Sequence, residues 1–309
     1  FGSDKPDMRF GMELHDVSEV VRDCDFVVFK NALENGGSVR GINAEGQGGM
    51  PRKKIDKLVE FAKGYGAKGL AYIAIAEDGT RKSSFAKFMT EEELSQISSK
   101  ADLKQGDVLL VIADANNNHV LSILGALRQT VAKKLDIIPE GVFNLLWITE
   151  FPFFEYDEES GEWLAMHHPF TAPMDDCLDY LETDKGKVRA KCYDLVLNGI
   201  ELSSGSIRIT DPQLQSRIFD LLGLTKEEAY EKFGYLLDAF RFGAPPHGGM
   251  GIGLDRLCMQ MLGCESLRDV VAYPKVQNAS EPMTECPAPV DELQLNDLGI
   301  AVTRTEEKE

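Results

Sequence analysis

Residues 248–257 read GGMGIGLDRL, a glycine-rich run that ends in an Asp-Arg pair. Glycines let a backbone approach a flat or phosphorylated ligand closely, and Arg256 falls where the run turns into a helix-like segment, a position suited to phosphate. The spacing differs from a dinucleotide-binding fingerprint, and no Gly-Lys-Ser/Thr follows as in a P-loop. We therefore predict a ligand-binding strand-to-helix junction over Gly248–Leu262; a tightly packed strand is the alternative.

Asn198-Gly199 separates two strand-like segments upstream of this run, Lys191–Leu197 and Ile200–Leu202. Asn-Gly between alternating apolar residues is the strongest short-range signal for a two-residue hairpin. If these two residues form the loop, Leu197 lies opposite Ile200 in an antiparallel pair.

Two acidic side chains are placed by this register. Val196 lies opposite Glu201, so Asp194 and Glu201 are diagonal neighbours on one face of the hairpin. Converging carboxylates suit a magnesium ion that bridges nucleotide phosphates, because magnesium takes oxygen ligands and usually uses one or two carboxylates with substrate phosphates. A solvated sheet face with two acids is the alternative.

Arg208 follows the small residues Ser203–Ser206 in an otherwise apolar strand. Small side chains leave space over a sheet, and the planar guanidinium fork suits a carboxylate. An ordinary surface arginine is the alternative. His167 and His168 precede a proline, and adjacent strand residues face opposite ways, so we expect at most one of them in a pocket. No two of the five histidines have helical ligand spacing, so a metal site of histidines is not indicated.

The remaining second half is rich in aromatic, strand-like segments and then in helices, which predicts an antiparallel sheet flanked by helices. The predicted strands are Val142–Phe151, Phe153–Tyr156 and Trp163–Met166, with a turn at Glu158–Gly161, and the predicted helices are Gln213–Leu222 and Lys226–Phe240. Thr225 and Glu228 have the capping-box spacing at the second helix.

The first half alternates strand and helix patterns, which predicts a compact α/β module. The predicted strands are Phe26–Phe29, Gly69–Ala76 and Asp107–Ala113, and the predicted helices run from Pro51 to Lys63, from Thr90 onward, and from Asn118 to Leu135. Thr90 and Glu93 have capping-box spacing, and a glycine-rich stretch, Gly36–Gly49, precedes Pro51. The fold class predicted for the whole chain is α+β.

The composition fits a globular protein whose 309 residues form about two domains. The net charge of −18 argues against broad attraction to nucleic acid, so RNA contacts should be local. No apolar run approaches the roughly 20 residues that span a bilayer, so we expect a cytoplasmic protein with no membrane partner. Six scattered cysteines indicate reduced thiols, not a zinc site or disulfide framework.

Several of these segments resemble the bacterial-type aspartyl-tRNA synthetases, which are class II aminoacyl-tRNA synthetases. Gly248–Leu257 looks like motif 3 of that class. The further matches, in order and covering essentially the whole chain, are Tyr193-Asp194, Asn198–Leu202, Gly205–Ile209 and Met166–Thr171, while Phe1–Phe10 resembles the segment that leads into the inserted GAD domain. Ser203-Ser204 stands where glycines are commoner in the family.

The resemblance implies a role for each matched residue. Asp194 and Glu201 would bind the magnesium ion of ATP, with Glu201 also contacting the nucleotide. Arg208, His167 and His168 would bind the substrate aspartate. The ATP site would be lined by Gly253, Leu254, Asp255 and Arg256, with Arg256 on the γ-phosphate. The implied activity is ATP-dependent formation of aspartyl-adenylate, followed by aspartyl transfer to tRNA.

The resemblance also implies a division of the chain and a set of partners. The expected parts are a catalytic-domain segment at 1–14, the GAD insertion at 15–140, the second half of the catalytic domain at 141–300 and a disordered tail at 301–309. The expected partners are tRNA(Asp), with tRNA(Asn) left open, aspartate and ATP, and the full-length protein is expected to be a homodimer.

The family's anticodon-binding barrel and its motifs 1 and 2 have no match here. Because the opening residues read as mid-protein sequence, we expect these elements upstream and expect residues 1–309 alone to be inactive. One alternative is a non-catalytic, tRNA-binding subunit of a tRNA-dependent amidotransferase that carries a GAD domain; motif 3 argues against it. A lysyl or asparaginyl synthetase is another, against which Arg208 and the inserted module argue.

Overall fold

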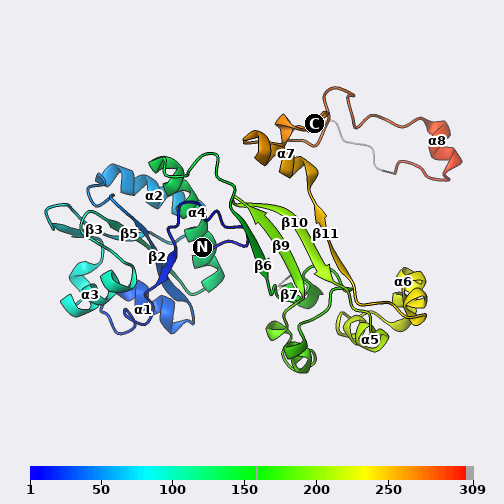
Figure 1. Cartoon of the computed structure of the whole chain (residues 1–309), viewed down its shortest axis with the longest axis horizontal. Helices are drawn as coiled ribbons and strands as arrows, with labels where there is room; N and C mark the ends of the chain where they lie inside the picture. Colours follow the sequence, from blue (N-terminus) through cyan, green and yellow to red (C-terminus); the bar gives the residue numbers. More distant parts are fainter. Residues whose placement is uncertain (158, 304–309) are drawn as a thin grey trace. The chain divides into compact units, whose positions relative to one another are not determined.

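The computed structural model describes residues 1–157 and 159–303 (Figure 1). The chain divides into two compact units, Phe1–Gly251 and Ile252–Glu309. Helices and mainly antiparallel strands are mixed in the first unit, which confirms the α+β class.

The first unit begins with a five-stranded sheet in the order β1-β2-β5-β3-β4. Its strands are β1 (Leu14–Asp16), β2 (Ser38–Ala44), β3 (Ala71–Ile75), β4 (Arg81–Ser83) and β5 (Val108–Asp114). Each neighbouring pair is antiparallel. The predicted alternation of strands and helices in this module is confirmed, and the sheet that the strands form is antiparallel.

Helices cover both faces of this sheet, as Figure 1 shows. They are α1 (Val27–Glu34), α2 (Arg52–Gly64), α3 (Glu91–Lys100) and α4 (Asn117–Leu135). The central strand β5 explains the two layers, because its alternate residues face opposite sides. Val108, Leu110 and Ile112 join the core under α2 and α4, whereas Leu109 and Val111 join the core under α1 and α3.

The strand predicted at Phe26–Phe29 is wrong, because this segment begins helix α1. Phe29 and Ala32 are its buried residues, and their spacing of three is helical. The glycine-rich stretch Gly36–Gly49 contains β2, which sequence inspection missed. The other segments predicted here are confirmed to within a few residues, including the capping box of Thr90 and Glu93.

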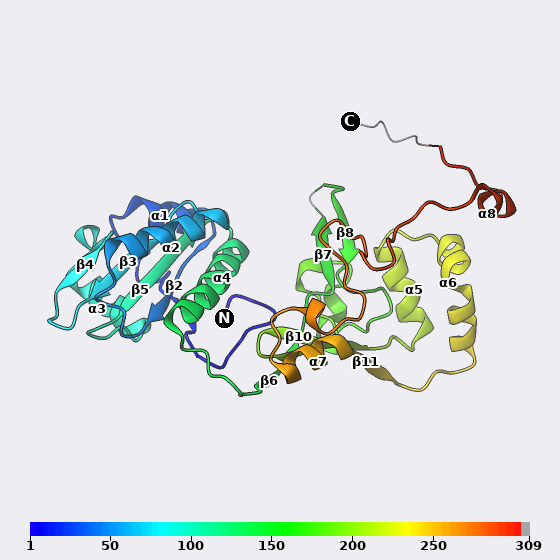
Figure 2. The same cartoon turned by 90° about the horizontal axis from the view of Figure 1, so that it is seen from above.

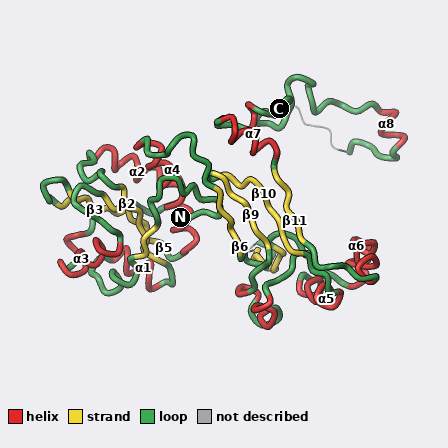
Figure 3. The backbone as a smooth tube through the Cα atoms, in the orientation of Figure 1, coloured by secondary structure: helices red, strands yellow, loops and turns green. Residues whose placement is uncertain are grey.

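A second sheet follows in the order β11-β10-β9-β6, and Figure 3 shows its strands side by side. The strands are β6 (Leu145–Thr149), β9 (Cys192–Leu197), β10 (Ile200–Ile207) and β11 (Gly248–Ile252). A separate hairpin pairs β7 (Phe154–Asp157) with β8 (Glu162–Ala165). The turn predicted between these two strands includes Glu158, which lies outside the described residues.

Two helices lie side by side after β10, as Figures 1 and 2 both show. They are α5 (Pro212–Leu221) and α6 (Lys226–Arg241), and Thr225 and Glu228 form the predicted capping box. A third core joins α5 to the second sheet and contains Phe151, Cys192 and Ile218.

The second unit contains α7 (Leu254–Leu262) and α8 (Glu292–Asp297). The predicted change from strand to helix is confirmed, because β11 ends at Ile252 and α7 begins at Leu254. The short 3-10 helices of the chain are Ala86–Phe88, Asp175–Tyr180, Lys185–Lys187 and Leu267–Asp269. Of the predicted disordered tail, 304–309 lie outside the described residues. Across the described part of the chain, none of the helices is both long and apolar enough to cross a membrane.

Candidate functional site

The β9–β10 hairpin has the predicted two-residue loop. Asn198 and Gly199 both have positive φ, 52° and 83°, as a type I′ turn requires. Leu197 is opposite Ile200, and Val196 is opposite Glu201, so the predicted register is confirmed at this end of the hairpin.

Beyond Glu201 the register shifts by one residue, so that Asp194 pairs with Ser204 instead of Ser203. This β-bulge is a feature that residue spacing did not reveal. Asp194 and Glu201 still come from facing strands on the two sides of the bulge. A bulge changes the direction in which nearby side chains point, so it affects the relative orientation of these two carboxylates.

Asp194 is 7% exposed, and its Oδ1 atom has no hydrogen-bond partner among the described residues. A buried carboxylate oxygen without a partner is costly unless a cation or donor approaches it. Burial, and then the charge of Asp194, raise the pKa of the Cys192 thiol to about 11. The unpartnered, buried Oδ1 is the feature of Asp194 that a bound cation would satisfy.

Arg208 lies directly after β10, beside the segment that contains the two histidines. Its backbone bridges to Thr171, and its guanidinium lies 5.4 Å from the centre of the Phe170 ring. His168 Nε2 lies 3.4 Å from the Ser206 hydroxyl. The structure therefore brings together His168, Ser206 and Arg208. Arg208 supplies a positive charge beside the Phe170 ring, and the two other side chains supply hydrogen-bonding groups.

The surroundings of His168 disfavour its protonated, charged form. Burial, and then the nearby charge of Arg208, lower the pKa of His168 below its ordinary value. The Phe170 amide donates to His168 Nδ1 at 3.3 Å, which leaves the proton of the neutral ring on Nε2. The ring can therefore donate towards Ser206 or a bound carboxylate.

His167 points elsewhere: its exposed ring packs edge-on against Phe151, with ring centres 5.1 Å apart. The two histidines therefore have different surroundings, as expected for neighbours on an extended segment. A direct aspartate contact by His167 stays a prediction.

The small residues before Arg208 have a packing explanation. A Cβ on Gly205 would lie 2.3 Å from the Gly249 carbonyl oxygen, so only glycine lets β10 and β11 approach this closely. The Tyr193 hydroxyl donates to the same oxygen at 3.2 Å. Glycine at 205 therefore allows β11, the strand at the start of the Gly248–Leu257 segment, to lie this close to β10.

The remaining predicted ATP-binding residues belong to the second unit. Gly253 is the N-cap of α7, and Leu254, Asp255 and Arg256 form its first turn. The backbone amides of a first turn and a nearby arginine are both suited to an anion.

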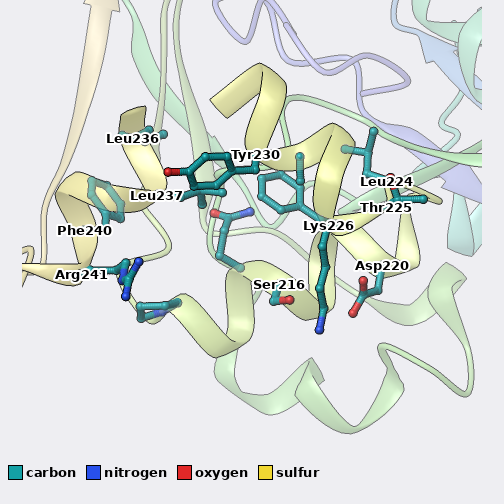
Figure 4. Close-up of a pocket in the computed structure, with 14 residues that line it drawn as sticks. Ser216, Asp220, Leu224, Thr225, Lys226, Tyr230, Leu236, Leu237, Phe240 and Arg241 are labelled. Carbon is teal, nitrogen blue, oxygen red and sulfur yellow. The ribbon is translucent and has the colours of Figure 1, made fainter. Parts of the chain in front are cut away.

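A cavity of about 240 Å³ lies between α5 and α6, lined by none of the predicted site residues. Figure 4 shows Tyr230, Leu237 and Phe240 extending from α6 and Ser216 from α5. Gln215, which also lines it, donates from Nε2 to the Pro169 carbonyl at 2.9 Å. This link to the histidine segment was missed from the sequence, because Gln215 has no motif around it.

The described residues contain no cluster of three or more histidines, cysteines or acidic residues that could hold a metal ion. Asp194 and Glu201 are two carboxylates. A magnesium ion held here would therefore take its further ligands from a nucleotide or from water, which is its usual preference.

The class of protein follows from comparison with known families. Residues 1–277 match the model of class II tRNA synthetases (D, K and N), and the chain belongs to this family. It is 60% identical over 304 residues to the aspartate–tRNA(Asp/Asn) ligase of Lachnoclostridium phytofermentans, covering 98% of this chain and 51% of that protein.

Two further relatives are named aspartate–tRNA ligase. The protein from Agathobacter rectalis is 59% identical over 309 residues, covering 100% of this chain and 52% of the relative. The protein from Ruminiclostridium cellulolyticum is 55% identical over 304 residues, covering 98% of this chain and 51% of the relative. The chain thus spans about half the length of the curated relatives it matches.

Proposed function

We propose that the full-length protein carrying this chain is an aspartate–tRNA ligase, and that residues 141–300 supply the second half of its catalytic domain. The observation that carries the proposal is the grouping of Arg208 and His168, which suits an acidic amino-acid side chain. The names of relatives at 55–60% identity support the same activity.

The aspartate side-chain carboxylate would be bound by the Arg208 guanidinium, because its planar fork matches two carboxylate oxygens. Neutral His168 would donate a hydrogen bond from Nε2. The positive charge of Arg208 at this subsite disfavours a lysine substrate.

ATP would be bound through its magnesium ion and its phosphates. Asp194 and Glu201 are the residues that would hold the ion, and the buried, unpaired Oδ1 of Asp194 fits that task. Arg256, in the first turn of α7, would contact the γ-phosphate. When bound, magnesium supplies charge neutralisation for the phosphates.

The proposed chemistry has two steps. The aspartate α-carboxylate attacks the α-phosphorus of ATP, forming aspartyl-adenylate and releasing pyrophosphate. A hydroxyl of the terminal tRNA ribose then attacks the aspartyl carbonyl and releases AMP. These reactions depend on positioning and charge neutralisation, so no protein nucleophile is required.

Further parts of the proposal concern organisation. Residues 15–140 are the GAD insertion, the full-length protein is a cytoplasmic homodimer, and tRNA(Asp) is its nucleic-acid substrate. The relative named for tRNA(Asp/Asn) makes tRNA(Asn) a second candidate. Residues 1–309 alone are expected to be inactive, because no match to motif 2 and its α-phosphate arginine is found among them.

Aminoacylation of purified tRNA tests the activity. The full-length protein should attach aspartate to tRNA(Asp), with asparagine and lysine as control substrates. Attachment of either control in preference to aspartate would overturn the proposal. Pyrophosphate exchange tests the inactivity of residues 1–309, and robust aspartate-dependent exchange by this chain alone would contradict it.

A GAD-containing amidotransferase subunit remains the competing function. Such a subunit does not need motif 3. It would bind tRNA but would not use ATP to activate aspartate. AMP production that depends on aspartate and tRNA therefore separates the two functions.

A further inference from the structure

Arg128 is a long charged side chain that the proposed chemistry does not use, yet it is almost completely buried, with 1% exposed. It lies on α4, in the module that carries the first sheet. Its guanidinium donates to three backbone carbonyls of the N-terminal segment, those of Asp7 at 2.7 Å, Met12 at 3.0 Å and Gly11. Five N–H donors in a planar fork make such multiple contacts possible.

Aromatic rings complete the surroundings of this guanidinium. It lies 4.7 Å from the centre of the Phe1 ring and 4.2 Å from that of Phe10. A guanidinium is weakly hydrated and stacks favourably on aromatic faces. Burial lowers the pKa of Arg128 to about 10, so the side chain is still charged at neutral pH. Arg128 therefore fixes the path of the incoming connector, residues 1–12, by contacts along its length.

The incoming connector reaches the tip of the β9–β10 hairpin through Asp7. Gly199 is so close to Asp7 that a Cβ on the glycine would lie 3.0 Å from the Asp7 Cβ. The Asp7 carboxylate itself accepts three hydrogen bonds from Arg9, two from the guanidinium at 2.7 and 3.0 Å and one from the backbone amide at 3.1 Å. Arg9 also donates to the Pro139 carbonyl at 3.3 Å, in the segment that leaves the module.

The outgoing connector, residues 136–144, contacts the same hairpin tip. Asn198 donates from Nδ2 to the Val142 carbonyl at 2.8 Å and accepts from the Asn144 amide at 2.9 Å. Its own amide donates to the Asn144 carbonyl at 3.2 Å. Both chain connections of the module therefore meet at the loop between the strands that carry Asp194 and Glu201.

We propose that Arg128 is a positioning residue that, through Asp7 and the incoming connector, fixes the β9–β10 hairpin and so the two carboxylates that would hold magnesium–ATP. The module at 15–140 would thereby help to set the nucleotide site, although none of the predicted nucleotide-binding residues lies in it. The catalytic part of this proposal rests on the proposed function; the mechanical connection does not.

Hydrogen exchange on residues 1–309 tests the connection directly. In Arg128→Lys, a single ammonium cannot replace the fork, so the amides of Leu195–Ser203 should exchange at least about tenfold faster. Amides of α6 should be unchanged. Arg22→Lys is the matched control, because Arg22 is exposed and pairs with Glu19. Unchanged exchange in Leu195–Ser203, with faster exchange only in α4, would overturn the connection.

Gly199→Ala perturbs the contact between Gly199 and Asp7 on the hairpin side and leaves Arg128 unchanged. The added methyl would press on Asp7, and the positive φ of Gly199 adds backbone strain. It should also increase exchange across the hairpin while the α4 amides stay protected. This variant keeps the connection testable if Arg128→Lys fails to fold.

Kinetics of the full-length protein test the catalytic part. Arg128→Lys should raise the KM for ATP and the magnesium concentration for half-maximal exchange by about tenfold, because misplaced carboxylates weaken ATP binding. The KM for aspartate should stay within about twofold. A fall in kcat with every KM unchanged would indicate a purely structural role and overturn the proposal. If the wild-type protein lacked aspartate-dependent exchange, the proposed function would fail, and the exchange of the hairpin amides would still decide the connection.

Discussion

Asp194 and Ser204 lie opposite each other in the β9–β10 ladder because the register shifts between Glu201 and Ser203. The shift leaves Leu202 and Ser203 both buried and Ser204 exposed. Asp194 itself is buried, with Oδ1 lacking a hydrogen-bond partner among the described residues. Its burial therefore lowers the stability of the chain.

Asp194→Asn should increase the stability of residues 1–309 while reducing magnesium-dependent ATP binding by the full-length protein. Removing a buried, incompletely paired charge should raise the free energy of unfolding by about 1 kcal/mol. Urea denaturation at pH 7 without magnesium measures this. Asp211→Asn is the matched control, because Asp211 is the N-cap of α5 and asparagine caps equally well. A less stable Asp194→Asn chain would contradict the interpretation.

His168 should titrate below its ordinary pKa of 6.5 in residues 1–309. Burial and the charge of Arg208 both disfavour the imidazolium, so Arg208→Met should raise the pKa of His168 towards that value without reaching it. Because the folded pKa is the lower one, the unfolded chain binds the proton first as pH falls. The contribution of neutral His168 to the free energy of unfolding is therefore fully present above pH 6.5. It is lost as the pH falls through the pKa of His168 in the folded chain.

An NMR titration of the histidine ring protons measures this pKa. A His168 pKa above 6.5 in the wild-type chain would contradict the effects of burial and of the Arg208 charge described above.

Gly205→Ala should destabilise residues 1–309 by about 1–3 kcal/mol, because the methyl would overlap the Gly249 carbonyl. Gly249→Ala is a matched control in the facing strand, since a Cβ there meets no other atom within 4 Å. It should change stability by less than about 0.5 kcal/mol. Equal effects in thermal unfolding would show that β10 and β11 are not in close contact.

The sequence pattern predicted the parts of the fold in which local signals agree. The capping boxes at Thr90 and Thr225, the Asn198-Gly199 hairpin and the junction after Gly248 each depend on residues within a few positions of one another. The segment at Phe26–Phe29 failed because four apolar residues fit either a strand or the start of a helix.

Features that depend on distant partners were not predictable. The bulge after Glu201 depends on how the facing strands pack, and counting residues from the loop cannot reveal it. The role of Arg128 could not be predicted from its neighbours in the sequence, because its carbonyl partners lie more than a hundred positions earlier in the chain. Spacing showed that His167 and His168 would diverge, but not which of them would face Arg208.

The most direct test of the account compares Arg208→Lys with the wild-type full-length protein in aspartate-dependent pyrophosphate exchange. Lysine keeps the charge but lacks the planar fork, so kcat/KM for aspartate should fall on the order of a hundredfold relative to asparagine. The KM for ATP should change by less than about twofold. Equal losses towards aspartate and ATP would contradict the assignment of Arg208 to the substrate side-chain carboxylate.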